Sequence, residues 1–190
     1  MKNIILSTAL LLNFVFSFGQ NLALIKNEGS LSWTGSAALN AYSLSGSLEA
    51  KSGQLMIKEG QVESASLVID MKSLDAENKD LRKHLRSEDF FEVKKYPEAI
   101  FILTKVSSFK EGEINLIGNL SIKDKTQQTE IPLTASKTGD KWQIKGKMIL
   151  DRTKFGIYYN SPNFFDNLKG QAIADEFELE FELYFQEVSQ

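Results

Sequence analysis

The sequence predicts an all-β protein, an antiparallel sandwich or barrel with one short helical insert. The first observation is at the C-terminal end, where apolar residues alternate with glutamates from Glu176 to Phe185. A period of two sends the apolar set to one face of a strand and the charged set to water. The second observation is that similar alternation recurs along the chain between glycine-containing turns. The third is that a single stretch, around residues 77–88, has helical spacing instead.

The other strands and their boundaries follow from the same pattern. Residues 65–71 and 142–150 alternate between apolar and polar side chains, and residues 99–106 form a mainly apolar run entered through Tyr96-Pro97-Glu98. Turn signals stand at residues 51–53, 59–60, 111–112 and 138–140. Short strands separated by such turns are typical of an antiparallel sandwich or barrel. We find no internal repeat or linker, so residues 20–190 are expected to form one domain.

The helical insert places Leu81 and Leu85 on one face, because side chains four residues apart lie above one another on a helix. Beside them runs a basic stripe of Lys79, Arg82, Lys83 and Arg86. This stripe could contact anionic head groups or a membrane surface. Because acidic residues are interspersed with it, a solvated helix face of mixed charge is the favoured interpretation.

The first 19 residues are expected to be a secretory signal peptide rather than part of the fold. Lys2 precedes an apolar stretch from Ile4 to Phe18, and small residues stand at positions −3 and −1 of a cleavage before Gln20. The stretch is shorter than the roughly 20 residues of a membrane span, although an uncleaved anchor is the alternative. Export of a cysteine-free chain suits a periplasmic or secreted bacterial protein.

Composition excludes several classes of function. The formal net charge is −3, which argues against a nucleic-acid-binding protein. The absence of cysteine removes thiolate nucleophiles, cysteine-ligated zinc and iron–sulfur clusters, and one histidine cannot make a multi-histidine metal site. We therefore expect no metal and no cofactor. No second apolar run is long enough to cross a membrane once the signal is removed.

Residues suited to catalysis are scarce. His84 has Asp80 and Glu88 four residues away on either side, so pairing with a neighbouring carboxylate is a better interpretation than general-base catalysis. Asp151 and Arg152 follow a strand, where an adjacent acid and base usually stabilise a turn. The aromatic residues exceed what a small core needs, which suggests an apolar cavity. We do not expect an enzyme.

Four blocks of sequence resemble, in order and spacing, the YceI-like family of exported polyisoprenoid-binding proteins. They are residues 84–101, which include His84-Leu85-Arg86-Ser87-Glu88-Asp89-Phe90-Phe91; 116–133; 150–157, with Asp151-Arg152 and Phe155-Gly156; and 68–74. The similarity covers roughly residues 45–185. Where many relatives carry a histidine, this chain has Tyr42-Ser43-Leu44-Ser45-Gly46.

The resemblance implies an eight-stranded, lipocalin-like antiparallel barrel that holds an isoprenoid or similar lipid chain. We expect the lipid chain to be contacted by Phe90, Phe91, Phe101 and Phe155 of the matched blocks and by Leu85 on the helix. Leu103 joins them because it shares a strand face with Phe101. Two alternatives stay open, an enzyme that uses the same cavity and a structural barrel filled by its own side chains. The sequence also leaves open a homodimer, and a role in transport, storage or stress protection.

Overall fold

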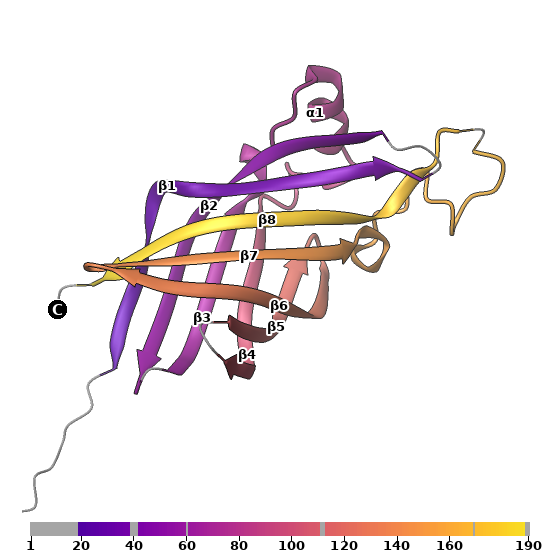
Figure 1. The fold of residues 1–190 in the computed structure, drawn as a ribbon. Helices are drawn as coiled ribbons and strands as arrows, with labels where there is room; N and C mark the ends of the chain where they lie inside the picture. The colour runs from indigo at the N-terminus through magenta and orange to yellow at the C-terminus, as the bar shows by residue number, and fades with distance from the viewer. Residues whose placement is uncertain (1–18, 39–41, 60, 111–112, 169, 189–190) are drawn as a thin grey trace, which may run out of the picture.

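A computed structural model describes residues 19–38, 42–59, 61–110, 113–168 and 170–188. The expected signal peptide, apart from Gly19, lies outside these residues, as do the predicted turn residues Gly60, Glu111 and Gly112. The chain forms a closed barrel of eight antiparallel strands with α1 beyond one end, as Figure 1 shows. The predicted fold is therefore confirmed, and of the two architectures that the alternation allowed, the structure is a barrel.

Each strand pairs with the next in the chain, and β8 returns to pair with β1. The strands are β1 (Gln20–Ala37), β2 (Ser43–Lys58), β3 (Gln61–Asp70), β4 (Glu98–Lys110), β5 (Glu113–Ile122), β6 (Lys125–Thr138), β7 (Lys141–Asp151) and β8 (Ile173–Glu187). Between β3 and β4 lie the 3₁₀ helix η1 (Met71–Ser73) and α1 (Lys79–Leu85), and η2 (Arg152–Phe155) follows β7.

The alternation in β8 sorts its side chains as predicted. Leu179, Phe181, Leu183 and Phe185 are buried inside the barrel, whereas Glu176 and Glu180 are exposed. The predicted helix is confirmed but is shorter than residues 77–88. It begins after Asn78, whose side-chain oxygen accepts hydrogen bonds from the backbone N–H groups of Asp80 and Leu81.

One predicted turn is wrong. Residues 51–53 lie within β2, where the register with β3 shifts by one residue between Ala50 and Ser52. Gly53 faces the interior, and a β-carbon there would come 3.0 Å from a ring carbon of Phe185. The glycine thus makes room for a ring from another strand instead of reversing the chain. The turn at Gly139 is confirmed, since it joins β6 to β7 with a φ of 62°.

β6 and β7 pair over only part of their length. β7 pairs with β8 along its whole length, but with β6 only as far as the pair Leu133–Gly146. The next residue of β6 is Pro132, which has no N–H to donate. Because β6 stays paired with β5 across Pro132, the missing donor is the one that would face β7. Proline therefore ends this ladder.

Candidate functional site

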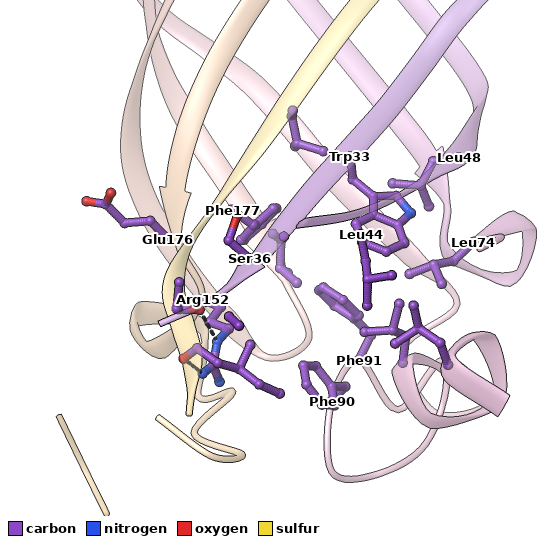
Figure 2. A pocket seen from close by; sticks show the side chains of 18 of the residues that line it. Trp33, Ser36, Leu44, Leu48, Leu74, Phe90, Phe91, Arg152, Glu176 and Phe177 are labelled. Atoms are coloured by element: carbon purple, nitrogen blue, oxygen red, sulfur yellow. Dashed lines mark hydrogen bonds between the residues drawn. The ribbon is translucent and has the colours of Figure 1, made fainter. Parts of the chain in front are cut away.

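A cavity of about 270 Å³ opens at the end of the barrel that carries α1. Its wall is almost wholly apolar and is built from the ends of strands together with α1 and the segments before β4 and β8 (Figure 2). Apolar residues in this wall include Trp33, Ala37, Leu44, Leu48, Ile69, Met71, Leu74, Leu81, Leu85, Phe90, Phe91, Ala99, Leu120, Ile122, Ala172, Ile173, Phe177 and Leu179. Such a surface binds an apolar group by excluding water from it.

The structure brings three of the six predicted site residues into this wall: Leu85, Phe90 and Phe91. Leu85 and its helical neighbour Leu81 both face the cavity, as their spacing predicts. Phe91 lies edge-on to Phe177 of β8, with ring centroids 6.5 Å apart. The segment after α1 therefore contacts β8 at the cavity wall through aromatic rings.

Phe101, Leu103 and Phe155 lie elsewhere. Phe101 and Phe155 are buried in the core, and Leu103 is partly buried against it, but none of the three lines the cavity. Phe155 lies in η2, which is held by Asp151 through hydrogen bonds from the backbone N–H and the hydroxyl of Thr153. Asp151 therefore stabilises the turn after β7, as the sequence analysis predicts.

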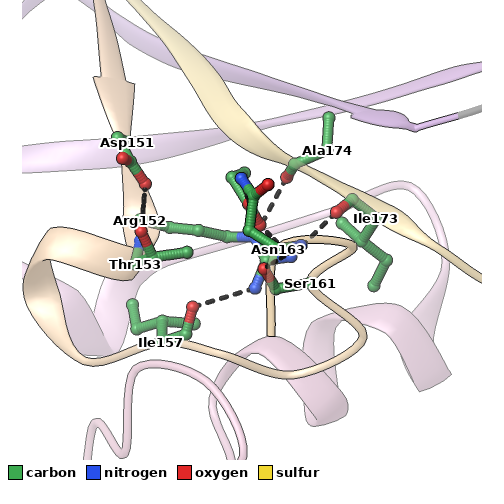
Figure 3. A network of polar contacts seen from close by, with 9 residues as sticks. Asp151, Arg152, Thr153, Ile157, Ser161, Asn163, Ile173 and Ala174 are labelled. Carbon is green, nitrogen blue, oxygen red and sulfur yellow. Dashed lines mark hydrogen bonds and ion pairs between the residues drawn. The ribbon is translucent and has the colours of Figure 1, made fainter. Parts of the chain in front are cut away.

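Arg152 does more than stabilise that turn. Only 4% of the residue is exposed, and it forms part of the cavity wall. Its guanidinium donates to the carbonyl oxygens of Ala174, Ile157 and Ile173 at 3.0, 2.9 and 2.9 Å (Figure 3). An Nη2 atom also lies 3.2 Å from a carboxylate oxygen of Asp175. Arg152 therefore links the segment that follows β7 to the start of β8 at the cavity wall.

The charge state of Arg152 is consistent with this structural role. Burial lowers the pKa of its guanidinium below the ordinary value, while the nearby carboxylates of Asp175 and Asp151 oppose that shift. Arginine nevertheless stays protonated in proteins. With its donors directed at three carbonyl groups, the side chain has little capacity left for a ligand.

Trp33 is a wall residue that the sequence analysis did not identify. Its indole N–H donates to the carbonyl oxygen of Asp75 at 3.0 Å, which links β1 to the segment before α1. Gly46 permits this contact, because a β-carbon there would lie 1.9 Å from that carbonyl oxygen and 2.6 Å from the indole nitrogen. The inward alternation of Leu31 and Trp33 was a local signal for this position.

The basic stripe of α1 is partly used within the protein. Arg82 forms an ion pair of 2.7 Å with Asp75, and Nε of Arg86 donates to the carbonyl oxygen of Leu74. The hydrogen bond from Arg82 lowers the pKa of the Asp75 carboxyl, and a hydrogen bond from the backbone of Ala76 adds to this shift. Lys79 and Lys83 are exposed, so the stripe is a solvated face of mixed charge, as favoured above.

His84 does not pair with Asp80 or Glu88 in the part of the chain that the structure describes. Its ring lies edge-on to Tyr159 and Phe90, with centroids 4.5 and 5.1 Å away. Its Nε2 is buried and has no hydrogen-bond partner among the described residues. Aromatic packing, rather than a carboxylate, therefore orients the imidazole.

Exposed aromatic side chains lie at the same end of the barrel as the cavity. Tyr42 lies in the cavity wall just before β2, and 61% of it is exposed. The segment between η2 and β8 adds Phe164 and Phe165, which are at least half exposed, and Tyr158, which packs against Phe164 at 4.3 Å between centroids. Of these four residues, Tyr42 alone belongs to the cavity wall.

The residues that the structure describes lack two features. They contain no group of three or more histidine, aspartate or glutamate side chains placed to hold a metal ion. Among the helices in the same part of the chain, none combines the length and the apolar character needed to cross a membrane.

Comparison with solved structures supports the fold. BcnA of Burkholderia cenocepacia superimposes with a TM-score of 0.67 at 21% identity, over 85% of this chain and 98% of BcnA. A domain from Saccharophagus degradans, described as a polyisoprenoid binding domain implicated in plant cell wall breakdown, gives 0.70 at 12% identity, over 88% and 98%. Identities this low show a shared barrel and nothing more.

Comparison of sequences goes further. A UPF0312 protein of Vibrio campbellii is 30% identical over 142 residues, which span 69% of this chain and 72% of that protein. A UPF0312 protein of Pseudomonas putida is 35% identical over 83 residues, 42% of this chain and 43% of its own length. Residues 23–185 match the family described as a YceI-like domain. Because this match covers almost the whole barrel, the chain belongs to the YceI-like family.

Proposed function

We propose that the protein binds the apolar chain of an isoprenoid or a similar lipid in the barrel cavity, for transport, storage or stress protection. The apolar wall of the cavity is the observation that carries the proposal. Each buried methylene contributes about 0.8 kcal/mol, so contact area alone can hold a chain. The likeness to the polyisoprenoid binding domain of Saccharophagus degradans lends support.

Binding fits the cavity better than catalysis does. A catalytic site needs a nucleophile, acid or base free to reach a substrate. The buried charged residue of the wall, Arg152, is occupied by three carbonyl groups and Asp175. Glu176, also in the wall, is exposed at the edge of the barrel. The family resemblance points the same way, to a binding protein.

We also propose that the protein is exported to the periplasm or secreted. The motivation is the charged start, the apolar stretch and the small residues before Gln20. The intact mass of the protein from the cell envelope or medium should lack about the first nineteen residues. Full-length chain in the membrane fraction would contradict this proposal.

The binding proposal is tested first on the purified native protein. Native mass spectrometry, with organic extraction and analysis of the extract, should detect a lipid-sized molecule or, after delipidation, uptake of an isoprenoid alcohol. A protein that carries no lipid and takes up none would refute binding and favour a purely structural barrel.

A pair of variants then locates the site. Leu48 lies in the wall on β2, whereas Ile102 faces outward on β4. Leu48→Glu places a charge against the ligand without a partner and should abolish uptake, while Ile102→Glu should leave uptake unchanged. Circular dichroism of both variants confirms that they are folded. Equal uptake by folded Leu48→Glu and Ile102→Glu proteins would place the ligand elsewhere.

A further inference from the structure

We infer that Phe101 and Phe181 form the floor of the cavity and limit how much of an apolar chain enters the barrel. This inference rests on the proposed function and adds a selectivity for the length of the bound apolar chain. Both rings are buried, at 6% and 8% exposure, and neither lines the cavity. The sequence analysis predicts that Phe101 contacts the ligand along its length. As part of the floor, Phe101 would instead meet only the inner end of the bound lipid chain.

On two strands from facing parts of the barrel, β8 and β4, the cavity ends before an inward phenylalanine. Leu179 lines it, but Phe181, the next inward residue of β8, does not. On β4 the same boundary falls between Ala99 and Phe101. Phe101 is also the cross-strand partner of Leu120, a wall residue of β5. The two rings therefore begin where the open space stops.

Two glycines leave the space that these rings occupy. A β-carbon at Gly118 would lie 2.3 Å from Cζ of Phe101, and one at Gly146 would lie 2.4 Å from Cζ of Phe181. Both distances are far below van der Waals contact, so the rings occupy the space that side chains would take. Glycine within a strand generally marks such a close approach. The middle of the barrel is thus filled by phenyl rings from facing parts of the wall.

The part of the cavity wall that β1 and β2 contribute near this level is also held in place. Figure 2 shows Trp33 and Leu48 at the end of the cavity away from Phe90. The hydrogen bond from Trp33 to Asp75 keeps the indole from turning aside. Beyond this level the interior is occupied by core residues, including Leu31 and Leu116. A chain that enters from the α1 end therefore meets these side chains where the cavity stops.

The volume sets the length of chain that fits. A dry protein cavity of about 150 Å³ holds a benzene molecule, which corresponds to about 25 Å³ per carbon. The cavity of about 270 Å³ therefore takes roughly eleven carbons, or about two isoprene units. The remainder of a longer chain would lie across the rim, beside Tyr42 and the exposed aromatic residues of the segment before β8.

The test uses linear primary alcohols of six to sixteen carbons, which compete with a fluorescent polyene fatty acid for the full-length mature protein. We expect the dissociation constant to fall about fourfold for each added methylene, up to about eleven carbons, and then to level off. A constant that continues to fall at that rate through sixteen carbons would overturn the floor. Failure of both the polyene and every alcohol to bind would instead overturn the proposed function, and the floor with it.

Two variants should move the plateau in opposite directions. Phe101→Leu makes the floor residue smaller by about 25 Å³ and should shift the plateau to longer alcohols by about one carbon. Ala99→Leu adds three carbons to the wall just above the floor and should shift it to shorter alcohols by about three carbons. Because Ala99→Leu fills open space, it keeps the test decisive if Phe101→Leu fails to fold.

Ile102→Ala is the matched control, since Ile102 neighbours Phe101 on the outer face of β4. It should leave the plateau unchanged. A plateau that stays in place in the folded Phe101→Leu and Ala99→Leu variants would refute the floor, even if binding itself persists.

Discussion

The contacts of Arg152 make a sharp prediction about stability. Arg152→Met keeps most of the apolar stem but removes every donor. The buried carbonyl group of Ile157 and the partly buried ones of Ile173 and Ala174 lose their side-chain partner, and Asp175 loses its counter-charge. Each orphaned buried group costs about 1–3 kcal/mol, and breaking a buried ion pair from one side costs about 3–5 kcal/mol.

These terms overlap, so their sum overstates the effect, and we expect a loss of about 4–6 kcal/mol in the free energy of unfolding. Domains of this size are stable by only about 5–15 kcal/mol, so Arg152→Met should be close to unfolded at 37 °C. Urea denaturation followed by tryptophan fluorescence and circular dichroism measures the difference.

Arg82→Met is the matched control. Its ion pair with Asp75 has a comparable distance of 2.7 Å, but the two side chains are 34% and 50% exposed. Exposed pairs contribute about 0.2–1 kcal/mol, so the control should lose little. A loss below about 1 kcal/mol for Arg152→Met, or equal losses for the two variants, would show that burial does not make the Arg152 contacts important.

Three smaller predictions test the fold. Phe181→Ala should lose about 3–5 kcal/mol in chemical denaturation, whereas Glu180→Ala, on the outer face, should change stability by less than about 0.5 kcal/mol; similar losses would mean that the β8 register is wrong. Gly139→Ala should lose about 1 kcal/mol, because its φ of 62° strains a side chain although nothing crowds the site; a gain would rule out that strain. Asp75→Asn should destabilise the protein at neutral pH and not in strong acid, because Arg82 lowers the pKa of Asp75, so its contribution is present above the ordinary carboxyl pKa and is lost as the pH falls through the lower, folded-state pKa. An effect of Asp75→Asn that is the same at both pH values would contradict that assignment.

Much of the fold was predictable because alternation is a local property of a strand. The β8 pattern identified its buried and exposed faces without knowledge of any partner strand. The spacing of Leu81 and Leu85 likewise identified the face of α1 that turns to the cavity. The turn predicted at residues 51–53 failed because Gly53 serves a contact with Phe185, and that contact is invisible to a local pattern.

The candidate site was predictable only in part. Leu85, Phe90 and Phe91 lie in the cavity wall, although ligand contact by these residues stays a prediction. Trp33 and Arg152 were not expected there, since each is placed by carbonyl groups from distant segments. His84 was expected beside a carboxylate at helical spacing, but the rings of Tyr159 and Phe90 lie against it instead.

The sequence by itself determined the class of the fold, the two faces of its clearest strand and the apolar character of the interior. These features depend on residue type and on a repeat of two or four positions, which the chain carries locally. Only the tertiary structure decided where that interior is open and where it is filled. Phe101 reaches Gly118 and Phe181 reaches Gly146 across neighbouring strands, so the open end of the barrel depends on register and closure, which no local repeat encodes.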